Sequence, residues 1–283
     1  MKLEQLKQMH AAGKLIGIFE GISNDDYHAG PGESSTRLKD ANQSMAHYLE
    51  GKTAPHDPTP AMLLGTYAHT HILEGEKVFN SRYFVMPEGK TRASADVKAA
   101  MAADPNRESV SFKEYQAVLG MQNAIDSHPI AKQLLIGKKE VAAYWIDPAT
   151  KLLCKAKSDC LRSDGMIVDL KTTTDASSDG FPIGCARNDY PLSAAFYLDG
   201  FRQAIEQSCN DLVQIPDAFV FLAIEKQSPY GISCFVISAE DLAKGRLKYE
   251  RALARIKEYN SSKKKGYCGY FPQIQTLNFP AWA

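Results

Sequence analysis

Several features that would assign this chain to a common class of protein are missing from its sequence. No apolar run approaches the roughly 20 residues that a membrane helix needs, and the first residues lack the apolar core of a signal peptide. The six cysteines include no C-x-x-C pair, which argues against a zinc ribbon or an iron–sulfur cluster and favours reduced, buried thiols. We therefore expect a soluble, cytoplasmic protein with no membrane association.

An excess of positive charge is also missing. The chain has 33 basic and 33 acidic residues and therefore no net charge. This balance argues against nonspecific coating of a nucleic acid duplex, but not against a channel in which basic residues are concentrated. No G-x-x-x-x-G-K-[ST] sequence is present, and Gly30-Pro31-Gly32 is more typical of a turn than of a phosphate-binding loop.

Length and composition suit one large α/β domain. The chain has 283 residues, of which 44% are hydrophobic, enough for a sizeable core. Apolar periodicity predicts helices near residues 36–50, 61–74, 111–127, 190–207 and 239–259, and strands near 15–19, 140–146, 154–161, 166–171, 218–224 and 231–237. Residues 87–110 are polar and weakly patterned, so we expect an exposed or partly disordered excursion there.

Residues 154–175 carry the strongest chemical signal. Their pattern predicts a β-hairpin whose strands are joined by a turn at residues 162–165, RSDG. Side chains alternate along a strand, so Asp169 and Lys171 are expected on one face, and Val168 and Leu170 on the other. In the first strand Lys155, Lys157 and Asp159 are expected to share a face. The opposite face carries only the small residues Cys154, Ala156, Ser158 and Cys160.

Two carboxylates on adjacent strands suggest a metal site. Mg²⁺ prefers oxygen ligands and often binds one or two carboxylates together with phosphate oxygens. A lysine near the second acid can orient or deprotonate the attacking water and offset charge that develops at phosphorus. The pattern therefore predicts metal-assisted phosphodiester hydrolysis. The alternative, a cross-strand ion pair between Asp159 and Lys171, is the commoner outcome for an isolated D-x-K sequence. An unpaired Asp169 in an apolar strand would be costly, however, and this favours the metal site.

These residues resemble the PD-(D/E)xK nuclease signature: Asp159, then Asp169-Leu170-Lys171 followed by Thr172-Thr173. More narrowly, the chain resembles the RecE-type nuclease domain of exodeoxyribonuclease VIII from phages and prophages. The matching blocks run in the same order through the chain: GISN at 21–24, YHAGPG at 27–32, LGT at 64–66 with His69, LE at 73–74, Glu140, YW at 144–145, DP at 147–148, the hairpin, AFY at 195–197, DG at 199–200, FVFL at 219–222 and PAWA at 280–283.

The resemblance implies both a fold and an activity. The fold is a single exonuclease domain over residues 1–283, with a restriction-endonuclease-like core at about 61–259 in which helices flank a mixed central β-sheet. The activity is that of a Mg²⁺-dependent exonuclease, with Mn²⁺ as a substitute metal, that degrades one strand of linear double-stranded DNA from its 5′ end. The 3′ tails that remain imply a single-strand annealing recombinase as partner, and retention on DNA ends implies a ring-shaped homo-oligomer.

The same resemblance assigns roles to residues. Asp159 and Asp169, with the carbonyl of Leu170, hold the metal, and Lys171 positions the attacking water. Glu140 and His69 assist a second metal or the leaving group. Without the resemblance, Glu140 would be interpreted as an exposed acid beside Lys138 and Lys139, and His69 as an ordinary histidine. Contacts with DNA are expected from Thr172, Tyr197, Lys155, Lys157 and Lys264.

Some features leave alternatives open. Ser193 stands where the family usually has an active-site glutamine, which leaves the positioning of water or phosphate by this helix open, and Tyr197 is equally consistent with a core residue. The protein could instead be an endonuclease or single-strand nuclease of the same superfamily, or a catalytically silent DNA-binding protein. The apolar tail at 277–283 is expected to dock on the body or in a subunit interface.

Overall fold

The computed structural model describes residues 1–54, 57–209, 214–263, 266, 268–270 and 273–279. Within these ranges, no helix combines the length and the apolar composition that a membrane span requires. Lys264 and the closing residues 280–283, which were given roles from the sequence, lie outside the described ranges.

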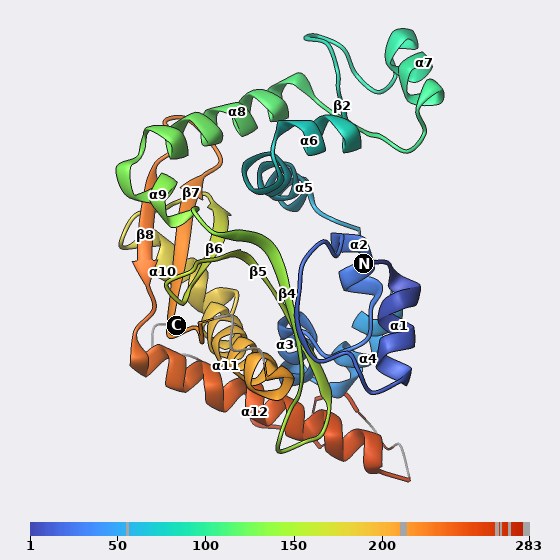
Figure 1. Ribbon diagram of the computed structural model, residues 1–283, viewed down its shortest axis with the longest axis vertical. Helices are drawn as coiled ribbons and strands as arrows, with labels where there is room; N and C mark the ends of the chain where they lie inside the picture. Colours follow the sequence, from blue (N-terminus) through green and yellow to red (C-terminus); the bar gives the residue numbers. More distant parts are fainter. Residues whose placement is uncertain (55–56, 210–213, 264–265, 267, 271–272, 280–283) are drawn as a thin grey trace.

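A mixed six-stranded sheet forms the centre of the protein (Figure 1). Its strands lie in the order β1 (Gly17–Phe19), β4 (Lys138–Ile146), β5 (Leu153–Leu161), β6 (Met166–Thr173), β7 (Ala218–Glu225) and β8 (Ile232–Val236). Neighbouring strands are antiparallel except β6 and β7, which are parallel. A parallel pair needs a long crossover, which here consists of α10 (Gly180–Arg187) and α11 (Tyr190–Ser208).

The predicted hairpin is present as β5 and β6. Gly165 adopts the left-handed φ of +79° that the turn requires and that glycine adopts without a steric penalty. Ile167, Val168 and Leu170 of β6 are fully buried because helices cover both faces of the sheet. As expected, the faces of β6 differ: Ile167 packs in one core cluster, whereas Val168 and Leu170 pack in the other.

Helices cover the two faces of the sheet as separate groups. One face packs against α11 and α12 (Ala239–Ser261), with α3 (Ser35–Gln43) and α4 (Met45–Thr53) beside them. The other face packs against α5 (Pro60–His69), η1 (Thr70–Glu74), α6 (Glu76–Arg82), α8 (Phe112–Ser127) and α9 (Pro129–Leu134). A third core cluster joins α1 (Leu3–Ala11) and α2 (Asn24–Ala29) to β4.

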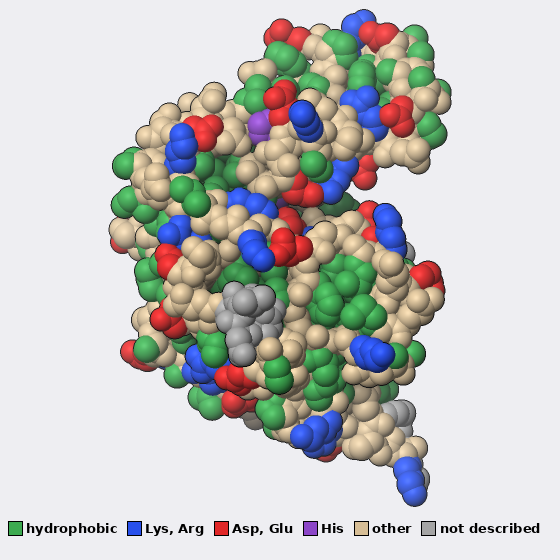
Figure 2. All heavy atoms as spheres, viewed as in Figure 1, with side chains coloured by type: hydrophobic (Ala, Val, Ile, Leu, Met, Phe, Trp, Pro, Cys, Tyr) green, Lys and Arg blue, Asp and Glu red, His purple; other side chains and the backbone are tan. Residues whose placement is uncertain are grey.

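Residues 83–110 form an arm that projects from the body (Figure 1). The arm contains β2 (Tyr83–Val85), α7 (Ala95–Ala103) and β3 (Glu108–Val110), and β2 pairs with β3 in a small parallel sheet. Residues 87–110 are mostly exposed, as one alternative predicted, but they are not partly disordered: they include α7 and β3, in which Val97 and Val110 are buried. Figure 2 shows a hollow between the arm and the body, with basic and acidic side chains mixed around it.

Two helices predicted as continuous are interrupted. The helix expected at 36–50 divides into α3 and α4 at Ser44, whose side chain accepts a hydrogen bond from the backbone N–H of His47 and thereby caps α4. The helix expected at 61–74 changes at His69 from α-helix to the π-helical turn η1. Of the apolar tail at 277–283, only residues 277–279 are described; Leu277 and Phe279 are exposed, so this part does not dock on the body as one alternative predicted.

Candidate active site

The site lies in a fork between β5 and β6. The two strands pair only next to their turn, through Cys160 with Val168 and Leu161 with Ile167. Beyond these pairs β5 continues alongside β4, whereas β6 continues alongside β7. Where the strands separate, a carboxylate oxygen of Asp159 accepts a hydrogen bond of 2.7 Å from the backbone N–H of Leu170. This bond fixes the carboxyl group of Asp159 inside the fork.

Glu140 of β4 faces the same fork. It lies opposite Asp159, between the register pairs Lys139 with Cys160 and Val141 with Ser158. Its φ is +54°, a left-handed conformation that glutamate rarely adopts and that is common at functional sites. The regular alternation of side chains breaks here, because Cys160 packs in the second core cluster whereas Cys154 and Ala156 pack in the first. The prediction that all four small residues of β5 share one face is therefore wrong for Cys160.

His69 reaches the fork from the end of α5. The helix begins at Pro60, after Thr59, whose side chain caps it by accepting a hydrogen bond from Met62. One turn before His69, a Cβ atom at Gly65 would lie 3.2 Å from the hydroxyl oxygen of Thr172. The absence of a side chain at Gly65 thus lets α5 approach β6 closely. His69 Nδ1 lies 3.7 Å from a carboxylate oxygen of Asp159.

Three predicted residues form a cluster that could hold a metal ion. The ligand atoms of His69, Glu140 and Asp159 all lie within 4.8 Å of one another. Asp169 lies outside this triplet, and its carboxylate forms an ion pair with Lys171. The N–H and C=O of one residue in an extended strand point the same way, so the carbonyl of Leu170 also faces the fork.

The charges of the site change the pKa values of its residues. Burial raises the pKa of Asp159 to about 6. The charge of His69 lowers this pKa in part, whereas the like charge of Asp169 raises it further. Burial alone would lower the pKa of Lys171, but the carboxylates of Asp169 and Asp159 outweigh it and raise this pKa well above its ordinary value. Lys171 therefore stays protonated. The structure thus brings all five predicted catalytic residues into one electrostatic network.

Lys157 and Lys155 are buried rather than available to DNA. The ammonium group of Lys157 lies 2.5 Å from Glu140 and donates a hydrogen bond of 2.7 Å to the side chain of Asn24. That of Lys155 donates bonds of 2.6 Å to the carbonyls of Tyr27 and Gly30. These contacts contradict the prediction that both lysines bind DNA: Lys157 positions Glu140, and Lys155 anchors the N-terminal segment.

The same contacts decide between the two interpretations of Glu140 that the sequence left open. Its partner is the buried Lys157 rather than Lys138 or Lys139, because Lys138 pairs with Glu20 and Lys139 bonds to the carbonyl of Leu135. Glu140 is therefore not the exposed strand-end acid of the alternative interpretation.

Helix α11 closes another side of the site. Tyr190, Ser193 and Tyr197 share one face of this helix, and each is half-buried. The hydroxyl of Tyr197 lies beside Ser35, and burial, with the charge of Asp169, raises its pKa to about 12. Tyr197 also contacts Phe219 edge-on in the core, so it borders both core and site. DNA contacts by Tyr197 and by Thr172 stay predictions.

The sequence interpretation missed two residues of the site, Lys39 of α3 and Tyr190 of α11. Lys39 of α3 and Lys171 of β6 lie 5.4 and 5.3 Å, respectively, from the centre of the Tyr190 ring. No motif marks Lys39, and only its spacing of four residues from Ser35 places both on one face of a helix. Lys39 and Lys171 reach Tyr190 of α11 only through tertiary packing, which no local sequence pattern reveals.

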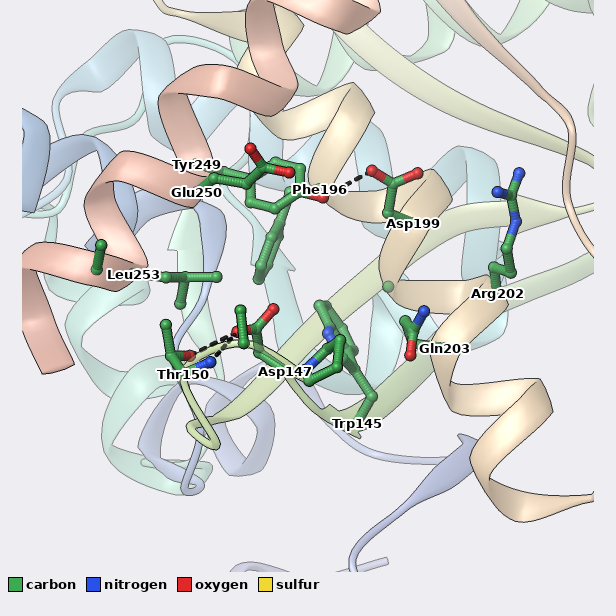
Figure 3. Close-up of a pocket in the computed structure, with 14 residues that line it drawn as sticks. Trp145, Asp147, Thr150, Phe196, Asp199, Arg202, Gln203, Tyr249, Glu250 and Leu253 are labelled. Atoms are coloured by element: carbon green, nitrogen blue, oxygen red, sulfur yellow. Dashed lines mark hydrogen bonds between the residues drawn. The ribbon is translucent and has the colours of Figure 1, made fainter.

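A separate pocket of about 430 Å³ lies further along α11 (Figure 3). Trp145, Phe196 and Tyr249 line it, and one of its acids, Asp199, is already bound by Arg246 and by the hydroxyl of Tyr249. A Cβ atom at Gly200 would lie 2.2 Å from the Trp145 ring, so the two pack tightly. Several of the matching sequence blocks, including YW at 144–145 and DG at 199–200, therefore have a packing role here.

The fold and the site together define a class of protein. A mixed sheet with helices on both faces, an acid on one central strand and Asp-x-Lys on the next is an α/β fold of the restriction-endonuclease type. Residues 34–275 match the profile of a family described as a PDDEXK-like domain of unknown function (DUF3799), and the chain belongs to this family. The predicted fold class and PD-(D/E)xK superfamily are thereby confirmed. The narrower RecE-type resemblance stays a prediction.

One solved structure shares this fold. The crystal structure of a candidate exonuclease from Eubacterium rectale is 14% identical, with a TM-score of 0.59, and the match covers 93% of this chain and 96% of that one. The crystal structure of SSO0001 is also 14% identical and the match covers 74% of this chain and 90% of that one, but its TM-score of 0.31 carries no argument. No curated protein matches the sequence.

Proposed function

We propose that this protein is a metal-dependent nuclease and that the fork between β5 and β6 is its active site. The observation that carries the proposal is the convergence of His69, Glu140 and Asp159 within 4.8 Å, with the Asp169–Lys171 pair in the same electrostatic network. Clustered acids with a neighbouring lysine are suited to hydrolysis of a phosphodiester.

The donor set fits a divalent cation. Carboxylates and an imidazole suit several divalent metals, and the dominance of oxygen favours Mg²⁺, with Mn²⁺ as a substitute. His69, Glu140 and Asp159 would hold the ion, and Asp169 and the carbonyl of Leu170 would be further ligands at the same fork. A bound cation would act as a Lewis acid that withdraws charge from the phosphate.

The chain's own residues prepare this site. Lys157 holds Glu140, and the backbone N–H of Leu170 holds Asp159, so both carboxylates are oriented before any ligand binds. Lys171 keeps its proton beside Asp169 and can therefore donate hydrogen bonds. Its role is to orient the attacking water and to offset negative charge at the phosphate.

We further propose the narrower activity implied by the resemblance: a 5′-to-3′ exodeoxyribonuclease that acts on linear duplex DNA and leaves 3′ tails for recombination. Two facts support it: the ordered sequence blocks along most of the chain, and a fold shared over 93% of its length with the candidate exonuclease. A ring-shaped homo-oligomer and a single-strand annealing partner belong to the same proposal. The exposed Ile274, Leu277 and Phe279 are available to a subunit interface.

Digestion of end-labelled DNA tests this proposal. Linear duplex labelled at the 5′ or the 3′ end is incubated with Mg²⁺ or with EDTA, beside covalently closed circular DNA. We expect early release of the 5′ label, only with Mg²⁺, and an intact circle. Asp159→Asn should be inactive, whereas Asp126→Asn, a change of the same chemistry on the exposed end of α8, should keep full activity.

Each other outcome favours a different function. Cutting of the circle would indicate an endonuclease, and preference for single-stranded DNA would indicate a single-strand nuclease of the same superfamily. Binding of DNA without metal-dependent cleavage would indicate a silent DNA-binding protein.

A further inference from the structure

Lys39 is a cation at the active site to which the sequence assigned no role. It is half-buried on α3, and its ammonium group lies 5.4 Å from the centre of the Tyr190 ring. The ammonium group of Lys171 lies 5.3 Å from the same ring centre. Two lysines from segments far apart in the sequence therefore converge on one tyrosine at the beginning of α11.

Within the described part of the chain, Lys39 has neither an ion pair nor a hydrogen bond. The carboxylates that act on it most strongly belong to Asp189, Asp169 and Asp40. Each of these acids pairs with another cation: Asp189 with Lys248 at 2.7 Å, Asp40 with Arg37 at 3.0 Å, and Asp169 with Lys171. The contact with the Tyr190 ring is thus the interaction that Lys39 retains.

A cation in this position is unfavourable unless an anion joins it. Removing an ammonium group from water without a counter-ion costs free energy, and the charge of Lys171 adds repulsion. Burial, followed by the charge of Lys171, lowers the pKa of Lys39 to about 8, which leaves it largely protonated at neutral pH. The site therefore holds a positive charge that no described group of the chain neutralises.

From this geometry we infer that Lys39 binds a phosphodiester group of the DNA strand that enters the active site, an inference that rests on the proposed nuclease function. Lysine binds phosphate as a point charge, so the contact is independent of base sequence. Lys171 lies on the Tyr190 ring beside the acidic fork, and Lys39 extends the positive charge from there towards α3. Lys39 thereby holds the strand while Lys171 serves the reacting phosphate.

DNA affinity tests the inference without relying on cleavage. Binding of a duplex with 5′-hydroxyl ends, so that every phosphate is a diester, is followed by fluorescence anisotropy with Ca²⁺ in place of Mg²⁺. We expect Lys39→Gln to raise Kd about 10-fold and to reduce the slope of log K against log salt by about 1. Lys39→Arg should recover most of the affinity, and Lys132→Gln, on the exposed face of α9, should match the wild type.

DNA duplexes with an uncharged linkage identify the phosphate that Lys39 binds. In a series of duplexes, each carries a single methylphosphonate at a different one of the first linkages. At one of these positions the substitution should weaken DNA binding by the wild type but leave DNA binding by Lys39→Gln unchanged. In unfolding experiments without DNA, Lys39→Gln should be as stable as the wild type or more stable, because it removes an uncompensated charge. A purely structural lysine would give the opposite sign.

The outcomes separate this inference from the proposed function. If the wild type binds and cleaves DNA but Lys39→Gln retains wild-type affinity and salt dependence, the role of Lys39 is wrong and the nuclease stands. If Lys39→Gln is destabilised, or if no methylphosphonate position distinguishes the two proteins, the inference is likewise overturned. Absence of DNA binding and cleavage by the wild type would instead refute the nuclease proposal.

Discussion

Replacement of Asp159 by asparagine should make the metal-free protein more stable at neutral pH. Burial raises the pKa of Asp159 from 3.8 to about 6, so the folded state binds this proton more tightly than the unfolded state does. Below pH 3.8 the carboxyl group is protonated in both states, so its burial carries no cost of ionisation. As the pH rises from 3.8 to about 6, the unfolded state releases the proton more readily, and the folded state therefore loses stability. This pKa difference corresponds to at most about 3 kcal/mol. The asparagine side chain of the variant cannot ionise, but its amide oxygen can still accept the hydrogen bond from the backbone N–H of Leu170.

Urea unfolding in EDTA between about pH 4.5 and 7.5 measures this effect. The free energy of unfolding of Asp159→Asn relative to the wild type should increase by about 2 kcal/mol over this range, with most of the rise below pH 6 and little change above it. Asp126→Asn, on the exposed end of α8, is the control for a change of charge alone. Mg²⁺ at about pH 7.5 should stabilise the wild type but not Asp159→Asn. A difference between the two proteins that does not vary with pH would refute the electrostatic account of the fork.

Three further substitutions test separate parts of the structure. Lys157→Met removes the partner of Glu140 and should weaken metal affinity about 10- to 100-fold, as measured by calorimetry; unchanged affinity would show that Glu140 needs no positioning. Gly65→Ala should lower activity without loss of stability, because its Cβ would press on Thr172 3.2 Å away, and Thr172→Ala should restore activity in the double variant; failure of this rescue would contradict the proposed contact. Gly200→Ala should destabilise the protein by about 1–3 kcal/mol in urea unfolding, because its Cβ would overlap the Trp145 ring, yet should leave the activity per folded molecule unchanged; a selective loss of activity would indicate that the pocket takes part in function.

The hairpin could be predicted because its signals are local. Turn residues at 162–165 separate two short strands, and the period of two places Asp169 and Lys171 on one face of β6. The fork could not be predicted, since it arises where β5 remains with β4 and β6 remains with β7. The sequence of a single strand does not show which distant strand it pairs with.

The clearest wrong predictions from the sequence concern lysine residues. Contacts with DNA were predicted for Lys155 and Lys157, but an alternating strand pattern does not reveal what covers a face. The covering groups are the carbonyls of Tyr27 and Gly30 and the side chain of Asn24, more than 120 positions earlier in the chain. The same tertiary packing brings Lys39 to Tyr190. The left-handed φ of Glu140 likewise has no local sequence signal.

The most direct test of the central claim is Mg²⁺-dependent hydrolysis of linear duplex DNA by four proteins: the wild type, Asp169→Ala, Lys171→Ala and the control Asp126→Asn. Circular dichroism and urea unfolding establish that each is folded. We expect the wild type and the control to release nucleotides only when Mg²⁺ is present, and the two site variants to be inactive although folded. Substantial hydrolysis by either folded site variant would contradict the assignment of the fork as the active site.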